Sequence, residues 1–217
     1  MTAKDDVVQR IVACGIVPVV RAPSSEIASR AVECMVLGGI DVVEITMTVP
    51  GARKLIETLA ARYGEKVLLG AGTVLDAETA RGCLGAGARF IVSPATDEDT
   101  IALCRSQGAP ALPGALTPTE IVRAARAGAD LIKVFPCSAV GGARYIRALR
   151  GPFPDLRFVP TGGISEGTVA DYIRAGASAL GMGSELVDVV KLGEDAASVT
   201  EAARRCLEAV RDARRPP

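Results

Sequence analysis

The chain has 217 residues, of which 49% are hydrophobic and 23% charged, and its 25 basic and 25 acidic side chains give a formal net charge of zero. This length suits a single large domain, and zero net charge argues against nucleic acid as the main partner. No apolar stretch reaches the roughly 18 residues of a membrane-spanning helix, and no signal-peptide pattern opens the chain, so we expect a cytoplasmic protein without a membrane partner.

Histidine does not occur anywhere in the chain. Its absence excludes Ser-His-Asp and Cys-His nucleophilic catalysis and most zinc sites, and we expect no metal. Acid–base chemistry must come from carboxylates, lysine, tyrosine, cysteine or ordered water. The six cysteines form no C-x-x-C pair and are interpreted as free thiols, with Cys137 as a small apolar filler.

Short apolar runs rich in β-branched residues alternate along the chain with segments of helical period. A helix over 5–14 comes first. The predicted strands cover 16–20, 41–45, 67–70, 90–92, 111–113, 131–135, 157–160 and 179–181. The predicted helices between and after them cover 26–37, 52–63, 77–84, 97–106, 118–127, 143–149, 166–175 and 196–211.

Eight strand-then-helix units require parallel strands, because a crossover helix brings each strand back in the same direction. No linker divides the chain. The pattern therefore predicts a single (β/α)8 TIM barrel domain over residues 1–217, with an extra N-terminal helix. An open doubly wound sheet would carry a glycine fingerprint after the first strand, and the segment 20–24 (VRAPS) is not one.

Lys133 stands in the middle of a predicted buried strand, Leu131-Ile132-Lys133-Val134-Phe135. Burying an ammonium without a partner is costly, so we expect the amine to favour its neutral form. A neutral amine is a nucleophile that can form a Schiff base with a carbonyl substrate. The alternatives are a structural ion pair or a phosphate ligand.

In a (β/α)8 barrel the chemistry lies at the carboxyl ends of the strands. The polar residues and glycine turns expected there are Arg21, Glu44, Thr46, Thr48, Thr73, Ser93-Pro94, Pro113-Gly114, Lys133, Thr161-Gly162-Gly163 and Gly183-Ser184. Glu44 is the second ionisable group inside a predicted buried strand. It is either an ion-pair partner for Lys133 or Arg21, or the general acid and base of the site, and without histidine it is the best candidate for proton transfer.

Two glycine-rich turns, Gly162-Gly163 and Gly183-Ser184, follow the seventh and eighth predicted strands. In this fold the backbone N–H groups of such turns and a helix N-terminus bind phosphate. The pair of turns predicts a phosphate site.

Five segments in order resemble the 2-keto-3-deoxy-6-phosphogluconate (KDPG) aldolases, which also cleave 4-hydroxy-2-oxoglutarate. The segments are Glu44-Ile45-Thr46, Gly70-Ala71-Gly72-Thr73-Val74, Lys133-Val134-Phe135-Pro136, Gly151-Pro152-Phe153-Pro154 and Pro160-Thr161-Gly162-Gly163-Ile164. The resemblance extends over about residues 12–187. It implies a homotrimeric barrel and a class I aldolase that needs no metal or other cofactor and works through a covalent imine.

The same resemblance assigns roles to individual residues. It makes Lys133 the Schiff-base lysine and Glu44 the proton-transfer residue. Around them, Thr73 and Thr161 would line the carboxylate end of the site, Pro94 and Phe135 its walls, and Gly162, Gly163, Gly183 and Ser184 the phosphate site, with Arg21 also contacting substrate.

The expected substrate is a phosphorylated 2-keto-4-hydroxy acid, cleaved to pyruvate and an aldehyde. Many family members carry an arginine four residues after the glutamate, where this chain has Thr48; it has Arg21 instead, as do some relatives that act on the galactonate-derived epimer. Three substrates therefore stay open: KDPG, its galactonate epimer and 4-hydroxy-2-oxoglutarate. The rival activity is a phosphate-binding barrel isomerase or synthase without imine chemistry.

Overall fold

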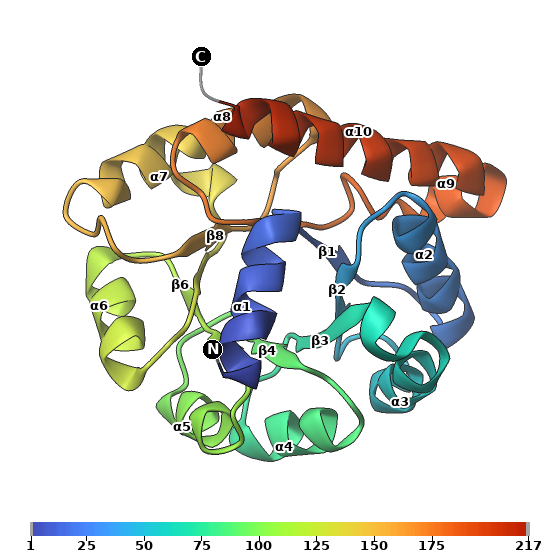
Figure 1. Ribbon diagram of the computed structural model, residues 1–217, viewed down its shortest axis with the longest axis horizontal. Helices are drawn as coiled ribbons and strands as arrows, with labels where there is room; N and C mark the ends of the chain where they lie inside the picture. The colour runs from blue at the N-terminus through green and yellow to red at the C-terminus, as the bar shows by residue number, and fades with distance from the viewer. Residues whose placement is uncertain (1, 216–217) are drawn as a thin grey trace.

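Parallel strands line the centre of the protein and helices surround them, following one another around the ring in chain order (Figure 1). The computed structural model describes residues 2–215. Its strands are β1 (Ile16–Val20), β2 (Val42–Thr46), β3 (Leu68–Gly72), β4 (Phe90–Val92), β5 (Ala111–Leu112), β6 (Gly114–Ala115), β7 (Ile132–Val134), β8 (Phe158–Pro160) and β9 (Leu180–Met182).

The α-helices begin and end close to the predicted positions. They are α1 (Ala3–Cys14), α2 (Ser25–Leu37), α3 (Ala52–Tyr63), α4 (Ala77–Gly85), α5 (Glu98–Ser106), α6 (Pro118–Ala127), α7 (Ala143–Arg150), α8 (Val169–Arg174), α9 (Val189–Glu194) and α10 (Ala196–Arg214). Short 3-10 helices lie at η1 (Gly64–Lys66), η2 (Ser138–Val140) and η3 (Glu166–Thr168).

The strands pair in two parallel sheets, β5-β4-β3-β2-β1-β9 and β6-β7-β8. Only Pro113 separates β5 from β6; proline has no N–H for a ladder, but its carbonyl still accepts from the Lys133 N–H at 2.9 Å. A single parallel bridge joins Thr161, just after β8, to Gly181 in β9. The predicted parallel α/β architecture is confirmed as a parallel sheet curled into a half-barrel.

Alternate residues of each strand face two different apolar layers, because side chains in a strand point to opposite sides in turn. One set packs outward under the helices. The other fills the interior near the amino ends of the strands with Val17, Val42, Leu68, Phe90, Leu112, Leu131, Val159 and Ala179. This interior layer lies below the carboxyl ends of the strands, where the polar residues were predicted.

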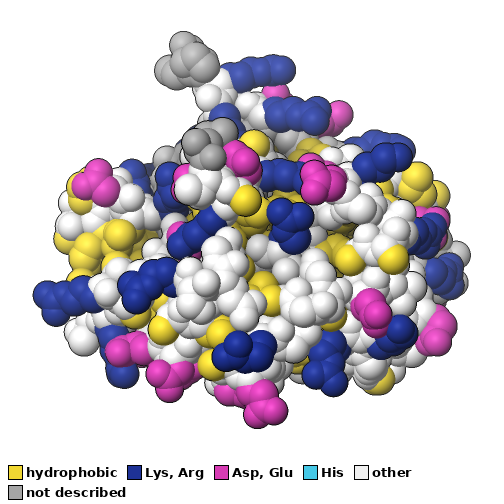
Figure 2. Space-filling model, turned by 60° about the horizontal axis from the view of Figure 1, so that its bottom comes forward, with side chains coloured by type: hydrophobic (Ala, Val, Ile, Leu, Met, Phe, Trp, Pro, Cys, Tyr) yellow, Lys and Arg dark blue, Asp and Glu magenta, His cyan; other side chains and the backbone are white. Residues whose placement is uncertain are grey.

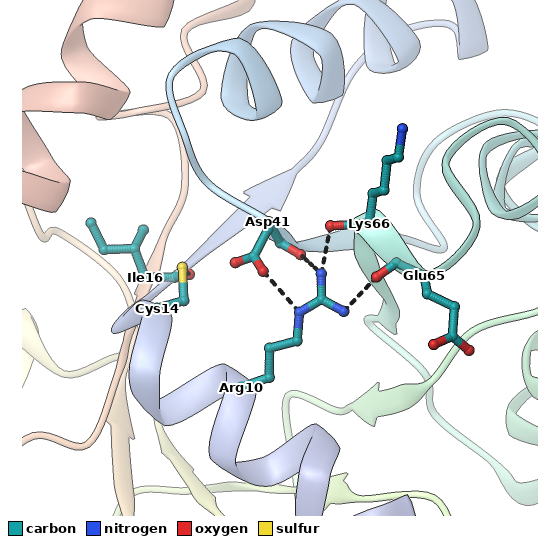
Figure 3. Close-up of polar contacts among 6 residues, drawn as sticks. All are labelled: Arg10, Cys14, Ile16, Asp41, Glu65 and Lys66. Carbon is teal, nitrogen blue, oxygen red and sulfur yellow. Dashed lines mark hydrogen bonds and ion pairs between the residues drawn. The ribbon is translucent and has the colours of Figure 1, made fainter.

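Helix α1 lies across the amino ends of the strands (Figure 1). Its Val7, Val8 and Ile11 are buried against the interior layer. Arg10 extends from the same helix and fixes it at its side: its guanidinium donates to the Asp41 carboxylate at 2.8 Å and to the backbone carbonyls of Asp41, Glu65 and Lys66 (Figure 3). The extra N-terminal helix is therefore a plug for one end of the strands.

Besides the division of the strand expected over 111–113 into β5 and β6, the structure differs from the prediction in two elements. The helix expected over 166–175 is the 3-10 helix η3 followed by α8, because the Ser165 and Thr168 side chains cap the first turn locally. The sequence did not predict α9, a helix of 6 residues that starts at the N-cap Asp188. The first difference lies between the two glycine turns, and the second follows the later turn. Neither changes the position of a strand.

Charged side chains of both signs are interspersed over the face shown in Figure 2, and no single-sign field covers it. Among the helices within residues 2–215, none has both the length and the apolar character that crossing a membrane requires.

Candidate active site

Lys133 occupies the central position of β7 and is only 6% exposed. Its neighbours across the sheet are Gly114 and Val159, which add no opposing charge. The Lys133 amine nitrogen lies 5.3 Å from the centroid of the Phe135 ring. The amine therefore stands on a rigid strand in apolar surroundings, as the sequence predicted.

Glu44 is the central residue of β2 and is 2% exposed. Burial raises the pKa of its carboxyl, and the charges of Lys133 and then Arg21 oppose that rise. The Glu44 oxygen Oε1 is buried and has no hydrogen-bond partner among residues 2–215. Native structures rarely leave such an atom unpaired, so this oxygen is free to bind a substrate group or a water.

The electrostatic influence of Lys133 on Glu44 places the two groups in the same region of the interior. The ion pair considered for Glu44 is not formed: within residues 2–215, no N···O distance of 4.0 Å or less joins Glu44 to Lys133 or to Arg21. The carboxyl and the amine are therefore not held together by a direct ion pair.

Thr73 follows β3 directly and has a backbone φ of 57°, in the left-handed region. It is the one non-glycine residue with positive φ among those that the structure describes. A β-branched residue is strained there, and such strain gathers at functional sites. The turn directs Thr73 to the same end of the sheet as Glu44.

The two glycine turns also lie at the carboxyl ends of the strands. Gly162 and Gly163 have φ values of 94° and 69°, which only glycine adopts readily. The backbone N–H groups of Gly163, Gly183 and Ser184 donate to no acceptor within residues 2–215. Unpaired backbone N–H groups are the kind of donors that can bind an anion.

The remaining predicted site residues also lie just after strands. Arg21 follows β1 and is exposed, Pro94 lies half-buried after β4, and Phe135 is 37% exposed after β7. Thr161 follows β8, is 6% exposed, and donates its hydroxyl to the Val159 carbonyl at 3.3 Å. Every predicted site residue thus lies at or just beyond the carboxyl half of a strand.

Cys137, four residues after Lys133, is fully buried, and burial raises the pKa of its thiol to about 11. A thiol that stays protonated at neutral pH is a poor nucleophile. The structure agrees with its interpretation as an apolar filler.

The sequence did not single out Gly72, which lies in β3 directly beside the Glu44 carboxyl. The sequence did offer a signal, because a glycine lies in the strand next to the one that contains Glu44. Glycines inside strands often mark places where another group approaches the backbone closely.

Residues 7–202 match the sequence profile of the KDPG and KHG aldolases. The chain belongs to this family. It is therefore an aldolase, a lyase that breaks a carbon–carbon bond. KHG denotes 4-hydroxy-2-oxoglutarate.

Individual relatives agree with this assignment. The 2-dehydro-3-deoxy-phosphogluconate aldolase of Treponema pallidum is 38% identical over 158 residues, 73% of this chain and 75% of the relative. The 2-dehydro-3-deoxy-6-phosphogalactonate aldolase of Escherichia coli is 32% identical over 198 residues, 89% of this chain and 96% of the relative.

Among solved structures, the KDPG aldolase of Legionella pneumophila is similar to this chain with a TM-score of 0.84 and 28% identity, over 91% of this chain and 96% of that one. Its crystal holds pyruvate captured as a covalent carbinolamine intermediate.

Proposed function

We propose that this aldolase cleaves KDPG, 4-hydroxy-2-oxoglutarate or both, giving pyruvate and glyceraldehyde 3-phosphate or glyoxylate, through a Schiff base on Lys133. The observation that carries the proposal is a buried amine, Lys133 on β7, whose charge acts on a buried carboxyl, Glu44 on β2, that has an oxygen without a hydrogen-bond partner within residues 2–215. The carbinolamine captured in the Legionella relative supports it, because a carbinolamine is the adduct of an amine and a ketone.

The reaction follows from these two groups. The neutral Lys133 amine adds to the C2 ketone of the substrate and gives a carbinolamine. The carbinolamine hydroxyl takes up a proton from the solvent and leaves as water, which gives a protonated imine. Glu44, directly or through a water, takes the proton of the C4 hydroxyl while the C3–C4 bonding electrons move into the imine. The aldehyde leaves. Glu44 returns the proton to C3 of the resulting enamine, and water then hydrolyses the imine to pyruvate and the free amine.

The other predicted residues hold the substrate. Thr73 and Thr161 bind the carboxylate next to the imine, Pro94 and Phe135 form the walls, and Arg21 adds a positive charge at the rim. The free N–H groups of Gly163, Gly183 and Ser184, in the two turns that also contain Gly162, bind the phosphate of a phosphorylated substrate.

Trapping with borohydride tests the chemistry. In the presence of pyruvate, reduction should add one pyruvyl group to the peptide that contains Lys133, as mass spectrometry detects. Lys133→Ala should lose the adduct and the activity. The matched control is Lys54→Ala, since Lys54 is exposed on α3 and pairs with Glu57. An adduct on another residue, or full activity of Lys133→Ala, would contradict the imine; turnover without pyruvate release would favour an isomerase or synthase.

The galactonate-derived epimer of KDPG is the second candidate substrate. Arg21 at the end of β1 and Thr48 in place of an arginine favour it, as does the likeness to the galactonate enzyme of Escherichia coli. Comparing kcat/KM for the two epimers and for 4-hydroxy-2-oxoglutarate decides the ranking. A higher value for the galactonate epimer would place the chain with that subgroup.

We further propose that the two sheets close into one eight-stranded barrel within a single domain, that three copies assemble, and that the enzyme works in the cytoplasm. The bridge between Thr161 and Gly181 supports closure on one side and the single-residue break at Pro113 supports it on the other. A sedimentation mass of three times 22.3 kDa would support the trimer.

A further inference from the structure

The strand beside Glu44 contains two glycines, Gly70 and Gly72. Glu44 pairs with Gly70 in the β2–β3 register, and Thr46 pairs with Gly72. Residues two apart in a strand face the same side, so Gly72 is the diagonal neighbour of Glu44 on the interior face. At this place a long side chain from β2 can lean over β3.

The Glu44 side chain fills the space that a side chain at residue 72 would need. A Cβ built on Gly72 would lie 1.7 Å from Oε1 of Glu44, 2.3 Å from its Cδ and 2.5 Å from its Cγ. Such distances are far below contact, so a side chain at residue 72 would force the buried Glu44 carboxyl to move.

Backbone conformation does not explain the glycine. Gly72 lies inside β3 and is not among the glycines with positive φ, so an alanine could adopt its backbone angles. A glycine in a strand interior also weakens the strand. The reason for glycine at this position is therefore the room that it leaves for the carboxyl.

We propose that Gly72 is a positioning residue of the active site, whose missing side chain holds the Glu44 carboxyl at the depth and distance from Lys133 that proton transfer requires. This rests on the proposed role of Glu44. Gly72 acts through Glu44 and needs no contact with the substrate. A methyl group at this position would move the carboxyl out of its place while leaving the Lys133 amine where it is, on β7.

The charged groups around the Glu44 carboxyl are few. Lys133 acts on it from β7 and Arg21 from the end of β1, and β3 adds no charge, because the stretch beside it is Gly70-Ala71-Gly72. Displacing the carboxyl changes both its burial and its distance from these two cations. The pH profile of the reaction will therefore report where the carboxyl lies.

Gly72→Ala tests the proposal. We expect kcat for cleavage to fall about 100-fold, the usual effect of misplacing a catalytic group by about 1 Å, with a smaller change in KM. The acidic limb of the kcat/KM profile should move to lower pH, since the carboxyl leaves its desolvated position. Borohydride should still trap pyruvate on Lys133 to the same end point.

Gly85→Ala is the matched control. Gly85 ends α4, has no positive φ, and has no atom within 4 Å of a built Cβ. It should keep both wild-type kcat and the wild-type pH profile. Circular dichroism and thermal unfolding check that both alanine variants fold.

A shorter carboxylate provides the rescue. Glu44→Asp withdraws the carboxyl by one methylene, so the double variant Glu44→Asp/Gly72→Ala should be more active, and more stable, than the product of the two single effects predicts. Additive effects would overturn the proposal, as would an unmoved pH limb in Gly72→Ala or a failure of both Gly72 variants to fold. If the wild-type protein forms no pyruvyl adduct, the proposed imine chemistry is wrong, whatever the Gly72 variants show. In that case a double variant that is more stable than the two single effects predict would still support the proposal that Gly72 makes room for Glu44.

Discussion

The carboxyl of Glu44 combines two properties that usually exclude each other, deep burial and a free oxygen. Burial raises its pKa, and the cations Lys133 and Arg21 only partly oppose this. The neutral carboxyl is therefore favoured more strongly in the folded protein than in the unfolded chain. A carboxylate whose pKa is raised is a stronger base than an exposed one, which suits a proton-transfer residue.

Glu44 should make the stability of the protein depend on pH. Because its folded-state pKa lies above the unfolded value of 4.5, the stabilisation is complete below about that pH and is lost as the pH rises through the folded pKa. We expect Glu44→Gln to remove activity and to become increasingly more stable than the wild type as the pH rises from 4.5 through the raised folded-state pKa. Denaturant unfolding across this range measures the difference. Glu57→Gln, at an exposed position, is the control. A difference in unfolding free energy between Glu44→Gln and the wild type that does not change with pH would contradict the prediction.

The backbone conformation of Thr73 should lower the stability of the protein, while its hydroxyl should contribute to substrate binding. Its left-handed backbone costs of order 1–3 kcal/mol, which Thr73→Gly relieves at the cost of about 1 kcal/mol of extra freedom in the unfolded chain. We expect Thr73→Gly to be about 1 kcal/mol more stable in urea unfolding and to raise KM, since the hydroxyl is lost. Thr119→Gly, in the exposed first turn of α6, should instead lose about 0.5–1 kcal/mol. A destabilised Thr73→Gly would show that the hydroxyl supports the fold.

The sequence made these residues visible to different degrees. Lys133 and Glu44 stand out because a charge inside an apolar strand has few structural explanations. The strain at Thr73 could not be predicted, since a β-branched residue disfavours positive φ. The contact between Gly72 and Glu44 depends on the register of β2 against β3, which no single strand pattern contains.

At the scale of elements, strand positions followed from composition and strand ends did not. The run from Phe90 to Val92 was predicted with its observed ends, because apolar β-branched residues and turn residues bound it sharply. The strand expected over 111–113 divides into β5 and β6 at Pro113. Its hydrogen bonding depends on the neighbouring strands, and the Lys133 N–H bonds to the Pro113 carbonyl from outside the segment.

Helix α1 should contribute to stability without taking part in the chemistry. Ile11 is fully buried between this helix and the interior layer, at the end of the strands opposite to Lys133. We expect Ile11→Ala to lose about 2–5 kcal/mol in denaturant unfolding, the usual cost of a large-to-small change in a core. Under folding conditions its kcat should stay near the wild-type value. Val12→Ala, on the half-buried side of α1, should lose less; equal losses would show that α1 is not packed as described.

The side chains that stabilise the protein and the groups proposed for catalysis lie toward opposite ends of the strands. Apolar side chains and α1 fill the amino ends, while ionisable groups, strained backbone and free N–H groups gather at the carboxyl ends. This polarity follows from the fold, because every parallel strand points the same way and every strand-to-helix turn reaches the same rim. It explains why the residues predicted at the carboxyl ends of the strands all lie toward one end of the structure.

Catalysis by the whole protein should not depend on a metal ion. A protonated imine on Lys133 withdraws electrons from the C3–C4 bond, the task that a divalent cation performs in metal-dependent carbonyl chemistry. The chain has no histidine, and within residues 2–215 no group of three or more Cys, Asp or Glu side chains is arranged to hold an ion. We expect kcat/KM to be unchanged after dialysis against EDTA, while pyruvate with borohydride abolishes activity. If EDTA removed the activity and added Mg²⁺ or Zn²⁺ restored it, the imine could not be the only electron sink.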